Sequence, residues 1–348
     1  MAQCLVTGGA GFLGSHLVEA LVARGDRVRV LDNFSTGILS NLDNVRSEVE
    51  LHLGDIDDRE LLFRATEGVE VLFHFVTPRW EIDDPTDDLE ARWAHEAQTV
   101  RVLNAACAAK VRRVIWASSC SVYGHSEDPR VCEDDAVLPT SSHGFAKLAA
   151  EMHCLAFTSL YGVETVRLRY SNVFGPRQCP TSLYAREVPM IVKSTLLGQP
   201  VTLGRDAAVK RDLIYIDDAI HATLLAASAP RVSGQVYNIA RGRSVDLFEV
   251  AAAVNDVIGA PARSLDQVGV DDAPAAVTIE NSRAETDFGF CPSADLQQGL
   301  RSMIEYYAEQ GGFPLADRVL AARQGPHRRA GRPASGPKPN EPESPHSP

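Results

Sequence analysis

The sequence predicts an α/β fold, in which a doubly wound parallel sheet is followed by a smaller C-terminal lobe. Short apolar segments alternate with helical segments without interruption through about residue 175, a rhythm typical of parallel sheets. A glycine-rich turn joins the first apolar segment to the first helical one, so that strand, helix and second strand occupy about 30 residues. Doubly wound sheets begin with such a compact β-α-β unit.

The elements of the first half follow from hydrophobic periodicity. Short apolar runs that end in glycine or polar residues predict strands, and apolar residues spaced three and four apart predict helices. We expect strands at 3–7, 27–32, 49–53, 70–76, 111–117 and 163–170, and helices at 12–24, 58–67, 89–109 and 143–161.

After residue 175 the predicted elements become shorter. We expect helices at 185–198, 217–228 and 246–258, with strands at 201–204, 212–216 and 236–240 between them. The chain therefore divides into a main domain over 1–175 and a lobe over 176–315 that is interleaved with the last strands of the sheet. Residues 321–348 contain seven prolines in 28 residues and cannot bury a core, so we expect a disordered tail there.

Composition excludes several classes of partner. The 34 lysines and arginines against 46 acidic residues leave a net charge of −12, which argues against nucleic acid or an anionic membrane as the main partner. The seven cysteines are scattered and form no CxxC pair, so we expect reduced thiols and no metal site. The N-terminus lacks the features of a leader, and no run of 18 apolar residues occurs. These features predict a cytoplasmic protein.

A dinucleotide site is predicted by the segment TGGAGFLGSH at 7–16, which follows a strand and opens a helix. Gly8, Gly11 and Gly14 stand where the backbone must turn sharply, where phosphate oxygens approach the amides, and where helix packs on strand. Asp32 ends the second strand, 18 residues after Gly14, where a carboxylate accepts hydrogen bonds from the adenosine ribose. The same carboxylate repels a 2′-phosphate, so the sequence favours NAD over NADP.

The third strand ends in a similar way. Asp55 and Ile56 follow it directly, after Gly54, and we expect them to flank the adenine because the carboxyl ends of parallel strands meet at one edge of the sheet.

Seven motif segments, taken together, resemble the extended short-chain dehydrogenase/reductase superfamily. They are TGGAGFLGSH (7–16), LDNFSTG (31–37), GD (54–55), SSCSVYG (118–124), HGFAK (143–147), RYSNVFGPRQ (169–178) and RDLIYIDD (211–218). The most similar branch is that of the NAD-dependent nucleotide-sugar epimerases and dehydratases of the UDP-glucose 4-epimerase type. The resemblance covers residues 3 to about 310.

The resemblance implies a Rossmann domain that holds NAD and a C-terminal lobe that holds a nucleotide-diphosphate sugar. It also implies a homodimer, formed through two helices per subunit near 92–109 and 143–161. The cofactor contacts that it implies beyond the glycines and acids named above are Phe12, Leu13, Asn33, Lys147 and Tyr170.

The resemblance implies three catalytic positions. In the family a serine or threonine and a tyrosine assist proton removal, and a lysine four residues after the tyrosine binds the cofactor ribose. Ser119 and Lys147 match two of these positions, although a serine at 119 could instead satisfy only its own turn. His143 stands where the family has its tyrosine.

Two interpretations of His143 are open. In the first, His143 is the acid/base. A phenol with a pKa of about 10 must be shifted by about three pH units to work at neutral pH, whereas imidazole starts at about 6.5. Lys147 and the positive nicotinamide ring both oppose an imidazolium, which keeps His143 able to accept a proton. In the second, His143 marks a site that has lost its hydride chemistry.

The two residues after Ser119 distinguish among reactions of the family. Sugar 4,6-dehydratases carry Asp-Glu here, and UDP-glucuronate decarboxylases carry a glutamate directly before the VYG turn. Cys120 and Ser121 supply no carboxylate, so both reactions are disfavoured. We expect both side chains to contact substrate. Cys120 is either an acid/base beside a transient ketone or a buried, inert thiol.

On the substrate side, Asn172 and Arg211 match family residues that bind the diphosphate and its surroundings. A guanidinium suits bidentate phosphate contact, although Arg211 could instead pair with a neighbouring aspartate. Two positions depart from the family. Asp271 stands where a second phosphate-binding arginine is expected, and His95 stands where an asparagine is expected.

Other arginines remain candidates for the diphosphate, namely Arg263 and Arg283. Pro78 and Trp80 replace the residues that usually follow the fourth strand, which suggests an altered pocket. The predicted function is a nucleotide-diphosphate-sugar epimerase that acts through a transient keto-sugar and bound NAD. The alternatives are an NADH-dependent reductase of nucleotide-linked keto-sugars and a non-catalytic NAD-binding protein.

Overall fold

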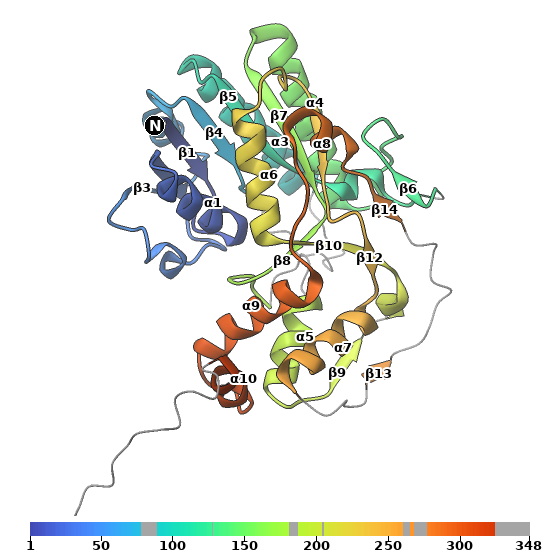
Figure 1. The fold of residues 1–348 in the computed structure, drawn as a ribbon. Helices are drawn as coiled ribbons and strands as arrows, with labels where there is room; N and C mark the ends of the chain where they lie inside the picture. Colours follow the sequence, from blue (N-terminus) through green and yellow to red (C-terminus); the bar gives the residue numbers. More distant parts are fainter. Residues whose placement is uncertain are drawn as a thin grey trace, which may run out of the picture.

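A computed structural model describes the chain over residues 1–77, 89–126, 128–180, 187–203, 205–259, 265–267 and 277–323. A parallel sheet of seven strands, with helices on both faces, forms its larger part (Figure 1). A smaller, mostly helical lobe lies beyond one end of this sheet (Figure 1). The predicted α/β fold, with its doubly wound parallel sheet, is confirmed.

The order of the strands explains where a ligand can bind. The strands are β1 (Gln3–Thr7), β2 (Arg27–Asp32), β3 (Val49–Leu53), β4 (Val71–His74), β5 (Arg113–Ser119), β7 (Glu164–Tyr170) and β11 (Val236–Ile239). They lie in the order β3-β2-β1-β4-β5-β7-β11, and every neighbouring pair is parallel. The winding reverses between β1 and β4, and open α/β sheets bind ligands outside the carboxyl ends of their strands at such a reversal.

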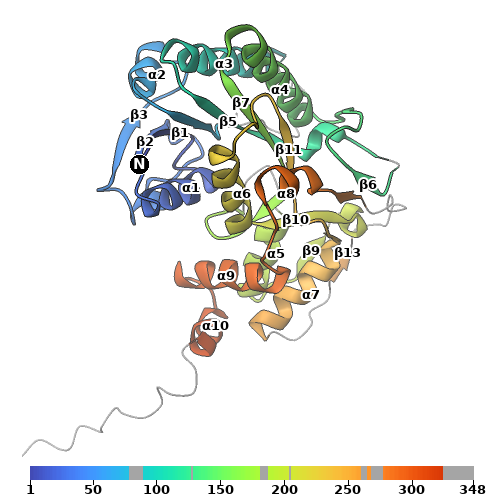
Figure 2. The same ribbon diagram turned by 45° about the horizontal axis from the view of Figure 1, so that its top comes forward.

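Helices cover both faces of the sheet and bury its strands. Helices α1 (Phe12–Ala23) and α6 (Ile216–Ser228) pack on one face, and α2 (Arg59–Thr66), α3 (Leu89–Ala108) and α4 (Ser142–Tyr161) pack on the other (Figure 2). Alternate residues of β1 illustrate this arrangement, because Val6 belongs to the first core and Leu5 to the second. Burial on both faces is why the central strands β1 and β4 consist mostly of apolar residues.

The lobe is built from helices and short strands. Its helices are α5 (Glu187–Leu196), α7 (Leu247–Ile258), α9 (Leu296–Glu309) and α10 (Ala316–Arg323). Its strands are β8 (Asn172–Phe174), β10 (Arg211–Tyr215) and β12 (Ser244–Val245), which form one sheet, and β9 (Val201–Leu203) and β13 (Leu265–Gln267), which form another. Between these elements the chain returns to the main sheet for α6 and β11.

Three further elements lie beside the main sheet. Strands β6 (Arg130–Val131) and β14 (Thr278–Ile279) pair with each other, and α8 (Ser282–Phe288) packs against β11. The sequence did not predict these strands, because two-residue strands carry no periodicity. The turns η1 (Leu39–Leu42), η2 (Cys120–Tyr123) and η3 (Arg205–Ala208) are single 3₁₀ turns.

Several boundaries differ from the expectations by a few residues, and two of these differences concern the site and the tail. Strand β5 runs to Ser119, two residues beyond the predicted end, so Ser119 belongs to the strand itself. Helix α10 continues to Arg323, which corrects the expected start of the tail at 321. Among the described residues, none of the helices has the length and apolar character that a membrane span requires.

Some of the sequence expectations concern residues outside the described ranges. These are Pro78, Trp80, Arg263, Asp271 and the segment 324–348, and the side chain of His95 is likewise not described.

Candidate active site at the carboxyl ends of the sheet

The glycine loop between β1 and α1 is tightly packed against the start of the helix. Gly8 adopts a φ of +74°, which favours glycine, and its amide donates to the carbonyl of Leu31 at 2.9 Å. A Cβ placed on Gly14 would lie 2.1 Å from the carbonyl oxygen of Gly8. Glycine at position 14 is therefore what lets the helix start directly above the loop.

The first turn of α1 fits the pyrophosphate of a dinucleotide. Gly11 precedes the helix and provides no side-chain cap, and the first turn contains no acidic residue. The amides at the start of a helix have no partner within the helix, and together with the helix dipole they attract an anion. Phe12 and Leu13 supply the first two of these amides.

Asp32 connects the end of β2 to the glycine loop. One of its carboxylate oxygens accepts the amide of Ala10 at 2.8 Å, and the other accepts the amide of Phe34 at 2.8 Å. The side chain is buried, so it is not an ordinary solvated residue at a strand end. Each carboxylate oxygen can accept a second hydrogen bond, which suits the two hydroxyls of a ribose.

The ends of β2 and β3 are tied to each other by polar side chains. The side-chain Nδ2 of Asn33 donates to a carboxylate oxygen of Asp55 at 2.6 Å. The other carboxylate oxygen of Asp55 accepts the backbone amide of Asp57 at 2.9 Å. Ile56 is buried in the core beneath them. These predicted cofactor residues therefore lie together at the same edge as Asp32.

The predicted proton-transfer residues come from β5 and α4. Ser119 ends β5, and its Oγ accepts the amide of Ser121 at 3.1 Å, so the hydroxyl caps its own turn and keeps its proton for donation. His143 and Lys147 are four residues apart in the first two turns of α4, which puts them on one face of the helix. The Nζ atom of Lys147 donates to the carbonyl of Ala117 at 2.9 Å. The lysine is thus anchored two residues from Ser119.

Burial sets the protonation of Lys147. Desolvation lowers the pKa of its ammonium from 10.5 to about 8, and the charge of Glu151 opposes this effect. The ammonium remains mostly protonated at neutral pH, so it can donate hydrogen bonds to a bound ribose.

Three other predicted site residues have defined surroundings. The Sγ atom of Cys120 donates to the carbonyl of Arg169 at 3.2 Å, and burial raises the pKa of this thiol well above its usual value. The Oγ atom of Ser121 is buried and has no hydrogen-bond partner among the residues that the structure describes. The Tyr170 hydroxyl lies 2.6 Å from Oγ1 of Thr223 on α6. Because its pKa is raised, the Cys120 thiol does not supply a thiolate at neutral pH.

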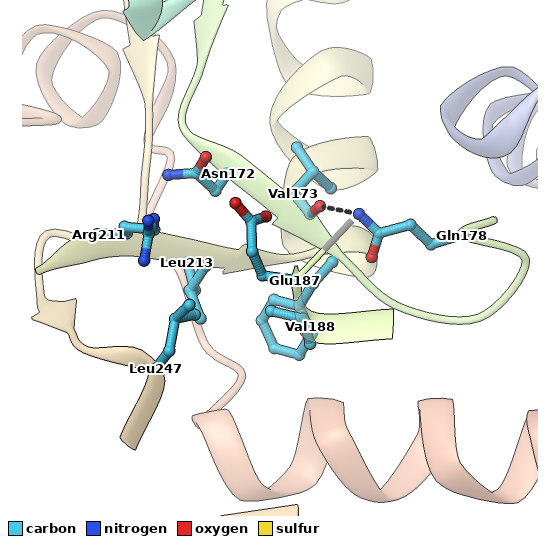
Figure 3. Close-up of a pocket in the computed structure, with 9 residues that line it drawn as sticks. Asn172, Val173, Gln178, Glu187, Val188, Arg211, Leu213 and Leu247 are labelled. Atoms are coloured by element: carbon cyan, nitrogen blue, oxygen red, sulfur yellow. Dashed lines mark hydrogen bonds between the residues drawn. The ribbon is translucent and has the colours of Figure 1, made fainter. Parts of the chain in front are cut away.

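Two of the predicted substrate residues line a pocket within the lobe. Asn172 on β8 and Arg211 on β10 border it, and Glu187 at the start of α5 borders it too (Figure 3). Leu213 and Leu247 supply apolar surface. No sequence motif singled out Glu187, because the pocket forms only when β8, β10 and α5 come together.

Comparison with known proteins assigns the chain to a family. A model of the NAD dependent epimerase/dehydratase family matches residues 4–240. The chain belongs to this family. The resemblance predicted from the seven motif segments is confirmed. That His143 stands at the position of the family's tyrosine stays a prediction.

Relatives across the epimerase/dehydratase family span almost the whole chain. A UDP-glucose 4-epimerase of Mycolicibacterium smegmatis is 31% identical over 313 residues, which cover 88% of this chain and 98% of that protein. A UDP-glucose 4-epimerase of Thermotoga maritima, solved with UDP-glucose, superposes with a TM-score of 0.80 at 27% identity and covers 88% of this chain and 99% of its own.

A third relative was solved with the cofactor. The UDP-glucose 4-epimerase of Thermus thermophilus in complex with NAD has a TM-score of 0.76 at 29% identity, and the match covers 89% of this chain and 99% of that one. The predicted cofactor, NAD, agrees with this family and with the fit of the glycine loop and Asp32.

Proposed function

We propose that this protein is an NAD-dependent epimerase of nucleotide-diphosphate sugars that acts through a transient keto-sugar. The observation that carries the proposal is the meeting of β5 and α4. There the carbonyl of Ala117 holds the Lys147 ammonium two residues from Ser119, at the same edge of the sheet as the glycine loop and Asp32. Kinship with UDP-glucose 4-epimerases supports it.

In this proposal His143 and Ser119 handle the proton of a sugar hydroxyl. When bound, NAD would supply a reversible hydride acceptor for the sugar carbon. The neutral imidazole of His143 accepts the hydroxyl proton and later returns it, while the Ser119 hydroxyl hydrogen-bonds to the same oxygen. Lys147 donates to the cofactor ribose and disfavours an imidazolium at His143.

The remaining predicted residues bind rather than react. The amides of Phe12 and Leu13 hold the pyrophosphate, and Asp32 accepts from the adenosine ribose. Asn172 and Arg211, which border the pocket beside α5, contact the nucleotide diphosphate. We propose a cytoplasmic location, in which the cysteines would stay reduced.

We further propose that two copies pair through α3 and α4. Helix α4 exposes Phe145, Met152 and Leu155 at helical spacing, and these apolar side chains lie on the helix that packs beside α3. A second copy of the chain would cover them in a four-helix bundle. Met152→Glu should convert the dimer to a monomer in light scattering, whereas a wild-type protein that is already monomeric contradicts the pairing.

The function is tested with a panel of nucleotide sugars. Purified protein incubated with each sugar, and followed by NMR, should convert at least one sugar to its epimer without net oxidation of the cofactor. Stoichiometric consumption of NADH with a keto-sugar would instead identify a reductase. No turnover of any nucleotide sugar would leave a binding protein.

The role of His143 is tested separately. His143→Ala should lower turnover by about a hundredfold or more, which is the usual contribution of a general acid/base. His153→Ala, farther along α4, is the matched control and should retain wild-type turnover. Turnover of His143→Ala within threefold of the wild type would remove His143 from the reaction.

A further inference from the structure

A buried ion pair joins the predicted catalytic helix α4 to strand β7. The carboxylate of Glu151 on α4 accepts two hydrogen bonds from Arg169 on β7, from Nε at 2.9 Å and from Nη2 at 2.7 Å. The Glu151 side chain is completely buried and that of Arg169 is nearly so. Isolated charges at this depth are costly, so the bidentate geometry is what makes the pair tolerable.

A hydrogen-bond network extends from the pair into the neighbouring elements. Ser118, the penultimate residue of β5, donates its hydroxyl to Glu151 at 2.5 Å. Nη1 of Arg169 donates to the Tyr123 hydroxyl at 2.9 Å, and this hydroxyl donates to the side chain of Asn238 on β11 at 2.7 Å. Replacing such an ion pair by apolar residues is often neutral for stability. The Glu151–Arg169 pair is therefore better explained by a role other than stabilising the fold.

The position of Glu151 supplies that reason. Glu151 lies one turn beyond Lys147 on α4, so that the two side chains share a face of the helix. Its bond to Ser118 holds β5 at the residue next to Ala117, whose carbonyl accepts the Lys147 ammonium. The carboxylate therefore acts on both the charge and the place of the lysine.

We propose that Glu151 is a positioning residue for Lys147: fixed by Arg169 and Ser118, it keeps the lysine protonated and in place for the cofactor without touching the cofactor itself. This inference rests on the proposed role of Lys147 in holding NAD. Arg169 serves to orient the carboxylate, since a guanidinium offers the two parallel donors that a carboxylate accepts.

Other titratable groups surround this part of the site and must be considered with Glu151. They are Arg167 and Arg169 on β7, Cys120 and Tyr123 on η2, Glu133 beyond η2, and His143 on α4 itself. Burial raises the pKa of Cys120, Tyr123 and Glu133, which keeps the first two neutral over the range in which Lys147 titrates. Among these groups, Glu151 is the one that opposes the loss of the Lys147 proton.

The test measures NAD⁺ affinity against pH by calorimetry, on full-length protein from which bound nucleotide has been removed. In the wild type, affinity should fall on the alkaline side with a midpoint near pH 8, where Lys147 loses its proton. Glu151→Gln keeps the size of the side chain but removes its charge. It should move this midpoint down by about one pH unit or more, the usual effect of losing a close opposite charge.

Glu164→Gln is the matched control. Glu164 pairs with Arg113 through two hydrogen bonds of 2.9 and 2.8 Å at the amino ends of β5 and β7, the far end of the same strand pair. Its loss should weaken the sheet and leave the midpoint where it is in the wild type. Equal midpoints in Glu151→Gln and Glu164→Gln would overturn the proposal, because the pair would then serve structure alone.

Two further variants keep the test decisive. If Glu151→Gln does not fold, the double variant Glu151→Leu/Arg169→Met replaces both charges by apolar groups and should also show a midpoint below that of the wild type. Lys147→Met should lose the alkaline transition entirely, and a transition that persists in it would overturn the proposal. Because the readout is cofactor binding, a failure to epimerise any sugar would refute the proposed function while leaving this outcome intact.

Discussion

Replacing Lys147 by methionine should stabilise the protein in the absence of cofactor while it weakens cofactor binding. The lysine is buried in α4, and its ammonium donates a hydrogen bond to the carbonyl of Ala117. Methionine has a similar length and no branch, so it fits the same space without a charge. The substitution should therefore change stability and cofactor affinity in opposite directions, raising the first and lowering the second.

The magnitude follows from the pKa of Lys147. Burial lowers it from 10.5 to about 8, and a difference of about 2.5 pH units corresponds to about 3 kcal/mol of cost for the charged form in the folded protein. Loss of the bond to Ala117 offsets about 1 kcal/mol of the gain. We therefore expect Lys147→Met to raise the free energy of unfolding by about 2 kcal/mol at pH 7.

The dependence on pH has a definite sign. Between pH 8 and 10.5 the unfolded chain binds a proton at Lys147 that the folded protein does not, so the stability of the wild type rises with pH across this window. The advantage of Lys147→Met is therefore full below pH 8 and should vanish by about pH 10.5. Urea denaturation of the cofactor-free proteins at pH 7 and pH 10 measures it. A variant that is less stable than the wild type at pH 7 would refute the reasoning.

Three further substitutions test the frame of the site. Gly14→Ala places a Cβ 2.1 Å from the Gly8 carbonyl oxygen and should lower the free energy of unfolding, measured by urea denaturation, by about 3 kcal/mol. The same variant should also lose affinity for NAD. Asp32→Ser should weaken NAD binding about tenfold or more and reduce the preference for NAD over NADP, as titration with both cofactors would show. Asp212 accepts three backbone amides and the Ser171 hydroxyl, so Asp212→Asn should lower the free energy of unfolding by about 3 kcal/mol.

The cofactor half of the site could be predicted because its signals are local. The strands that end at Thr7, Asp32 and Leu53 begin and end where periodicity predicted. The glycines and Asp32 act through backbone conformation and through their position at a strand end, both of which are short-range properties. The spacing of His143 and Lys147 is likewise a property of one helix.

Asn172 and Arg211 were predicted from the family resemblance, but the rest of the pocket and the hydrogen-bond network around Glu151 were not predictable from local signals. Glu187 reaches the pocket only because α5 packs beside β8 and β10. Tyr123, Glu151 and Arg169 meet across η2, α4 and β7, and as single residues in the sequence they look like ordinary turn, helix and strand residues.

Local patterns in the chain were therefore enough to specify the doubly wound sheet, the glycine loop and the spacing of His143 and Lys147. The tertiary structure decided the rest. It placed the carbonyl of Ala117 against the Lys147 ammonium and fixed the nearby carboxylate of Glu151 through Ser118 and Arg169. The physical reason is that backbone preferences and helical periodicity act over a few residues. The energy of a buried charge, by contrast, depends on partners that only the packing of distant segments brings within hydrogen-bonding distance.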